Sequence, residues 1–162
     1  MNKVQANLTK QGGITLIEVL IAMLILAVGL LGMASLQVRA VSDTSNSSSR
    51  SIAIFYANDM ADRIRSNPAG EQGNLYNDET GDAQKAGCLA VGGCNSSDMA
   101  AHDKWEWQQN VSNALPAGAG TITKNGNIYT VTVSWNSRVQ AQDANGDQVG
   151  TVTSSVNFSF EP

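Results

Sequence analysis

The chain is poor in the residues that most often build metal sites and catalytic sites. It has one histidine, His102, and two cysteines, Cys88 and Cys94. A structural metal site needs about four ligands, so this set does not complete one, and no metal or cofactor is expected. His102 stands beside Asp103, but a catalytic pair also needs a nucleophile, and no such motif is present. We therefore expect a protein that is not an enzyme, with His102 on the surface or half-buried.

The sequence also lacks the motifs of phosphate and nucleic-acid binding. It contains no glycine-rich phosphate loop and no recognisable nucleic-acid-binding module. The formal net charge is −4 at pH 7, and an acidic domain is a poor partner for phosphates because like charges repel. No nucleic-acid partner is expected.

Residues 142–150, QDANGDQVG, contain only part of a calcium-binding loop. Asp143, Asn145 and Asp147 alternate around a glycine. A full loop also needs a late bidentate carboxylate, and the next acid is Glu161. Asparagine, glycine and aspartate favour turns without any ion, so we expect a turn between strands here.

Charge is almost absent from residues 14–36, where Glu18 is the one ionisable side chain. A helix over this range is about 35 Å long, at about 1.5 Å per residue, and a bilayer core is about 30 Å thick. Lys3 and Lys10 precede the segment, and the first acid after it is Asp43. This asymmetry predicts a single membrane span with the N-terminus in the cytoplasm and the rest of the chain outside.

The two cysteines frame the short sequence CLAVGGC in the part of the chain predicted to be outside. An even pair in an exported domain indicates a disulfide, and the shortage of other ligands argues against a metal site. A bridge between Cys88 and Cys94 would contribute about 2 to 3 kcal/mol.

Two ordinary interpretations of the first 36 residues leave features unexplained. A secretory signal has an apolar region of about 7 to 15 residues, shorter than this one and without an acid. A plain membrane anchor would carry Glu18 at an unexplained cost of up to about 3 kcal/mol.

A third interpretation accounts for the whole segment. The stretch GGITLIEVLIAMLILAVGLLGMASLQ resembles the N-terminal signature of type IV prepilins and the related pseudopilins. The matching features are a short basic leader ending in glycine, a hydrophobic residue, a threonine, a glutamate at the fifth mature position and a long apolar helix. Gly13 would end the leader, Ile14 would be the first mature residue, and Glu18 would be the fifth.

The resemblance implies a processing step and an assembly step. A membrane-embedded prepilin peptidase would cut after Gly13, and Ile14 would be N-methylated. Glu18 would then pair with the N-terminal amine of a neighbouring subunit. The resemblance divides the chain into a leader, a membrane and filament-core half-helix, an amphipathic half-helix and a periplasmic head, at residues 1–13, 14–36, 37–66 and 67–162.

The resemblance also implies partners and a location. Partners would be the prepilin peptidase, other minor and major pilins and the inner-membrane pilus assembly platform. The segments WEWQQNVSNALPAGAGTI and LAVGLLGMASLQ are most similar to the type IV pilus modification proteins, the V-type minor pilins. Such a subunit would help to initiate pili, would be incorporated at their tip, and would support pilus biogenesis, twitching motility and adhesion. A minor pseudopilin of a type II secretion system is the alternative, and a binding role for residues 67–97 is a second hypothesis.

Helical periodicity returns after the apolar segment. Apolar residues from Ile52 to Ile64 recur every three or four positions, and Pro68 is a stop signal. Residues 42–50, SDTSNSSSR, are weak helix formers. Two alternatives stay open for them: a continuous helix, or a point where the helix bends or unwinds.

Residues 67–97 are rich in glycine, asparagine and aspartate and suggest a surface connection. A helix is expected to start with a cap at Ser97 or Asp98 and to end before Pro116, with one apolar face formed by Trp107, Val111, Ala114 and Leu115.

The C-terminal third changes from helical to strand periodicity. An Asn-Gly turn at 125–126 and alternating apolar residues predict a small antiparallel sheet. The expected fold is α+β, with a long N-terminal helix packed on this sheet and an additional helix.

Overall fold

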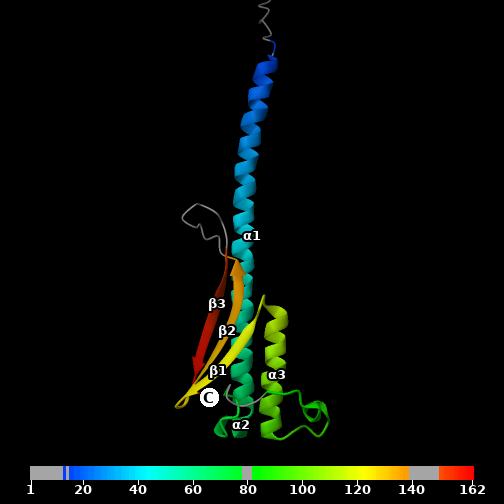
Figure 1. Cartoon of the computed structure of the whole chain (residues 1–162), viewed down its shortest axis with the longest axis vertical. Helices are drawn as coiled ribbons and strands as arrows, with labels where there is room; N and C mark the ends of the chain where they lie inside the picture. The colour runs from blue at the N-terminus through cyan, green and yellow to red at the C-terminus, as the bar shows by residue number, and fades with distance from the viewer. Residues whose placement is uncertain (1–12, 14, 78–81, 139–149) are drawn as a thin grey trace, which may run out of the picture. The chain divides into compact units, whose positions relative to one another are not determined.

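The computed structural model describes residues 13, 15–77, 82–138 and 150–162 (Figure 1). The chain divides into two compact units, residues 1–41 and 42–162, which are described separately. The elements are α1 (Leu16–Ser66), α2 (Pro68–Gln72), a short 3-10 helix η1 (Ala86–Leu89), α3 (Ser96–Ala114), β1 (Ala119–Asn125), β2 (Ile128–Arg138) and β3 (Thr151–Phe160).

The described part of the first unit is the N-terminal half of α1. Its first turn forms where the carbonyl of Thr15 accepts hydrogen bonds from the backbone N–H groups of Glu18 and Val19, at 3.1 and 3.3 Å. All side chains from Thr15 to Val41 are exposed, although most are apolar. Among the described residues, α1 is the one helix long and apolar enough to cross a bilayer.

In the second unit, α1 changes to a helix with one buried face. Its buried side chains are Ala53, Ala57, Met60, Ala61 and Ile64. Their spacing of three and four residues places them on one stripe, which confirms the predicted amphipathic segment. Residues 42–50 are helical, so the continuous-helix alternative holds, and α1 ends at Ser66, two residues before Pro68.

The connection after α1 is more ordered than its composition predicts. Asn67 is 5% exposed and caps α2 by accepting a hydrogen bond from the Gly70 N–H at 3.1 Å. Tyr76 is fully buried and belongs to the core. The interpretation of residues 67–97 as a surface connection is therefore wrong for Asn67, Gly70 and Tyr76, which are buried.

Helix α3 begins slightly earlier than expected. Its cap is Asn95, whose side chain accepts a hydrogen bond from the Asp98 N–H at 2.8 Å. Trp107, Val111 and Leu115 are buried as predicted, but Ala114 is exposed. The indole N–H of Trp107 donates to the carbonyl of Tyr56 at 2.8 Å, which ties α3 to α1.

The three strands form one antiparallel sheet in the order β1-β2-β3. Asn125 pairs with Ile128, so Gly126 and Asn127 make the hairpin turn, and Gly126 has a φ of +60°. A positive φ at the first of two turn residues suits glycine because it has no Cβ. The sheet and hairpin confirm the α+β prediction.

One face of the sheet completes the core of the second unit. Its largest contributions come from alternate residues of β2, namely Tyr129, Val131, Val133 and Trp135. Figure 1 shows the C-terminal half of α1 with α3 running beside it, and the two helices and the sheet share a single cluster of buried side chains.

Candidate assembly site

Glu18 lies in the first turn of α1 and is exposed. Within the described residues, its carboxylate has no ion pair or hydrogen bond. A negative charge at this end of a helix is favourable because the backbone N–H groups there carry partial positive charge. Glu18 begins an open, otherwise apolar strip that continues through Val19, Ala22, Met23 and Leu26. The site is thus one acid at the edge of an exposed hydrocarbon surface.

The residues of the predicted processing site are only partly described. Gly13 is exposed, and a Cβ added there would meet no atom within 4 Å. Ile14 lies outside the described residues, as do the calcium-like residues Asp143, Asn145 and Asp147. Cleavage after Gly13 and methylation of Ile14 therefore stay predictions.

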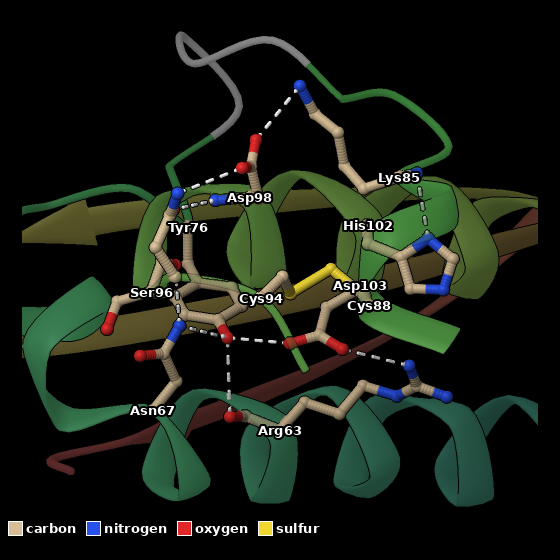
Figure 2. Close-up of a disulfide and its surroundings, with 11 residues drawn as sticks. Arg63, Asn67, Tyr76, Lys85, Cys88, Cys94, Ser96, Asp98, His102 and Asp103 are labelled. Atoms are coloured by element: carbon tan, nitrogen blue, oxygen red, sulfur yellow. Dashed lines mark hydrogen bonds and ion pairs between the residues drawn. A yellow bond between two sulfur atoms is a disulfide. The ribbon is translucent and has the colours of Figure 1, made fainter. Parts of the chain in front are cut away.

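The predicted disulfide is present in the second unit. Cys88 and Cys94 are joined by an S–S bond of 2.01 Å, with their Cα atoms 4.6 Å apart (Figure 2). The bridge closes a short loop that starts with η1. Two apolar side chains of this loop are exposed, Leu89 at 70% and Val91 at 111% of the reference area.

The loop is held against α3 by contacts of Lys85. The Lys85 backbone N–H donates to Nδ1 of His102 at 3.2 Å, and its Nζ lies 3.1 Å from Oδ1 of Asp98. His102 is 7% exposed and stacks on Trp105 with ring centroids 5.8 Å apart. The expectation of a surface or half-buried histidine is wrong, because this ring packs under the loop and accepts a backbone hydrogen bond.

A polar cluster that sequence patterns did not reveal links α1 to α3. Arg63 lies 3.0 Å from Asp59 of its own helix, and 3.2 and 2.7 Å from the α3 residues Asp103 and Glu106. The hydroxyl of Tyr76 donates to the second oxygen of Asp103 at 2.7 Å (Figure 2). The cluster fixes the two helices and the segment after α2 together.

The cluster also changes the proton affinity of its members. Burial opposes the charge of Arg63, but the hydrogen bond to Glu106 and the nearby carboxylates outweigh it and raise the Arg63 pKa. Burial and the hydrogen bond to Asp103 raise the pKa of Tyr76, because a tyrosinate there would be desolvated beside a carboxylate. Both effects favour the protonation states that join the helices.

The same second unit offers no evident site for a metal. Among the described residues, no group of three or more histidines, cysteines, aspartates and glutamates is arranged to hold one. The polar groups of the Arg63 cluster bind each other, which indicates structural roles.

Two protein-family models match the chain. The prokaryotic N-terminal methylation motif matches residues 8–34, and the family described as Type IV pilin Tt1218 matches residues 35–105. The two matches are adjacent and meet in α1. The chain belongs to the type IV prepilin family. Searches of curated proteins and of solved structures gave no match.

The family match relates the chain to structural subunits and relates the methylation motif to α1. Type IV pilins are a family of structural subunits and not of enzymes. The apolar half of α1 is the part that the methylation motif covers, including Glu18. Membrane anchoring and contact with other pilins and with the prepilin peptidase follow as general properties of such a subunit.

Proposed function

We propose that this pilin is processed by cleavage after Gly13 and methylation of Ile14, and that Glu18 then pairs with the new amine of a neighbouring subunit. The supporting observation is the exposed acid at the start of an apolar helix, with no partner within the described residues. Cleavage would create an α-amino group four residues before this acid.

The proposed pairing has a clear physical basis. An ionised carboxylate inside a bundle of apolar helices is costly unless it meets an opposite charge. A subunit inserted out of step would leave both its acid and its neighbour's amine unpaired. The pair would therefore define the axial position of each subunit and would also neutralise both buried charges.

Before assembly, residues 14–36 would anchor the subunit in the inner membrane, with the leader 1–13 in the cytoplasm. Residues 37–66 would continue the helix outside, and residues 67–162 would form the periplasmic head. The assembly platform would then move the subunit into a pilus, where α1 packs against the same helix of other pilins.

We further propose a minor role, as a subunit that helps to start the filament and stays near its tip. The similarity of residues 105–122 and 26–37 to V-type minor pilins supports it. Deletion in the native host should reduce the number of surface pili and twitching motility. Normal piliation with a loss of type II secretion would instead identify a minor pseudopilin.

The processing and assembly steps need separate tests. Mass spectrometry of the protein from native membranes should find a mature chain that starts at methylated Ile14. A Gly13→Val variant should keep the leader, because a branched side chain would obstruct the extended backbone in the peptidase. A mature protein that still starts at Met1 would refute the processing step.

The role of Glu18 is tested by incorporation into sheared pili. Glu18→Gln should still be exported and cleaved but should be depleted from pili. Asp43→Asn is the matched control, because Asp43 is also an exposed acid of α1 but lies beyond the apolar segment. Equal depletion of both variants, or of neither, would contradict the proposed pairing.

The disulfide loop favours a second candidate function, in which the head binds a partner at the filament tip. Leu89 and Val91 are exposed on a loop that a covalent bridge constrains. A double Leu89→Ser and Val91→Ser variant should keep the fold and the filament but reduce adhesion. Deleting residues 67–97 would be a poor test, because Tyr76 belongs to the core.

A further inference from the structure

A groove in the second unit, lined mostly by residues with polar side chains, lies between α1 and the end of the sheet. It has a volume of about 500 Å³, within the range of small-molecule sites. Asn46, Ser47 and Arg50 of α1 line it, together with Trp135 and Ser137 of β2 and Ser154 of β3. None of the lining residues is an aspartate or glutamate, although the whole chain has a net charge of −4.

Trp135 gives the groove an unsatisfied hydrogen-bond donor. The residue is 4% exposed, and its buried Nε1 has no hydrogen-bond partner within the described structure. Buried polar groups nearly always have a partner, because an unpaired donor is costly. Trp107 shows the usual arrangement in this protein, since its Nε1 donates to the carbonyl of Tyr56 at 2.8 Å. The indole N–H of Trp135 is therefore an unpaired donor, for which the described residues supply no acceptor.

Arg50 adds a second donor group. Its side chain is exposed and has no ion pair or hydrogen bond within the described part of the chain. A guanidinium can bind a carboxylate through two parallel hydrogen bonds. Among the described lining residues, the groove thus combines one cation and one neutral donor without an acid.

The remaining groups of the groove can both donate and accept. The hydroxyls of Ser137 and Ser154 lie 2.6 Å apart, and either one can be the donor. The Asn46 amide nitrogen donates to the carbonyl of Arg138 at 2.8 Å, which leaves its oxygen as an acceptor. Sugar hydroxyls also donate and accept, so they match this lining better than an apolar side chain does.

We propose that this groove binds a short acidic saccharide, such as a uronic acid oligomer. Its carboxylate pairs with Arg50, its hydroxyls exchange hydrogen bonds with Ser137, Ser154 and Asn46, and one of its oxygens accepts the indole N–H of Trp135. This site would give the head a ligand of its own, beyond the proposed role in assembly. Its test does not depend on cleavage or on Glu18.

The experiment uses the full chain in a detergent without a sugar headgroup, so that the detergent does not compete. Calorimetric titration with a short oligoglucuronate should show saturable binding, and a neutral oligoglucose of the same length should bind much more weakly. Arg50→Met should weaken binding about tenfold or more. Lys85→Met is the matched control: it removes the same charge outside the groove, from an ion pair whose side chains are 39% and 41% exposed, and it should bind normally.

Nuclear magnetic resonance locates the ligand independently. The indole N–H signal of Trp135, assigned with a Trp135→Phe variant, should shift at saturation, whereas that of Trp107 should not move. Absence of saturable binding, equal binding of the neutral sugar, or an unmoved Trp135 signal would overturn the proposal. An oligoglutamate peptide that binds as tightly as the sugar would also overturn it, because the groove would then recognise carboxylates of proteins.

Discussion

Gly120 of β1 lies directly against the ring of Trp107. A Cβ built at Gly120 would overlap the Cη2 and Cζ3 atoms of that ring and would lie 3.0 Å from Cζ2. Trp107 is 2% exposed and cannot move outward without breaking its hydrogen bond to the carbonyl of Tyr56. We therefore predict that Gly120→Ala destabilises the head although it adds only one methyl group.

The size of this effect follows from three contributions. Overpacking a core costs about 1 to 3 kcal/mol, and loss of a buried hydrogen bond costs about 1 to 3 kcal/mol. Gly120 is not at a positive φ, so alanine can adopt its backbone conformation and restores about 0.4 to 1 kcal/mol through the unfolded state. The expected net loss is about 1 to 6 kcal/mol, a large part of the stability of an ordinary domain.

Chemical denaturation of the full chain, followed by near-ultraviolet circular dichroism of its tryptophans, measures the loss. Gly87→Ala is the matched control, because a Cβ at Gly87 would meet no atom within 4 Å. The control should change the free energy of unfolding by less than about 1 kcal/mol. Equal stability of the two variants would refute the close packing of β1 on Trp107.

Three further predictions concern the links between elements. Arg63→Met should lower the free energy of unfolding by about 1 to 3 kcal/mol, because it leaves partly buried carboxylates of α3 without their cation. Arg65→Met breaks one exposed ion pair and removes the guanidinium that lies 4.6 Å from the centroid of the Phe160 ring, so it should cost about 1 kcal/mol. The pKa of Tyr76 is raised, so its stabilising contribution is complete below pH ~10 and is lost at higher pH; denaturation at increasing pH should show this loss, and Tyr76→Phe should reduce it. Reduction of the bond between Cys88 and Cys94 should cost about 2 kcal/mol and leave the near-ultraviolet spectrum of the head intact, while complete unfolding would contradict a local role for the bridge.

The parts of the fold that sequence patterns predicted are those set by neighbouring residues. The buried stripe of α1 follows a spacing of three and four residues, and the buried face of β2 follows strict alternation. The hairpin lies where the Asn-Gly pattern predicts one, but its turn residues are Gly126 and Asn127, one position later than expected. The disulfide follows from two cysteines that are close in sequence. None of these required knowledge of distant contacts.

The parts that were missed depend on residues far apart in the chain. Tyr76 lies in a segment whose glycines and asparagines suggest a surface loop, yet its hydroxyl reaches Asp103, 27 residues later. His102 is buried because the backbone of Lys85 crosses it. The unpaired indole of Trp135 is equally invisible in sequence, since alternation predicts that the ring is buried but does not predict the partners of its nitrogen.

The two halves of α1 have different needs for partners. From residue 53 to residue 64, its apolar stripe is covered by the sheet and α3 of the same chain. From Leu16 to Val41, the large apolar side chains of the described structure are 42% to 78% exposed. Burying such side chains is worth about 1.5 to 3 kcal/mol each, so this half has to be covered by lipid or by other helices. The same exposed surface therefore suits both a membrane anchor and a pilin subunit. In the proposed assembly, Glu18 would gain the α-amino group of a neighbouring subunit as its partner, which an isolated subunit in lipid does not have.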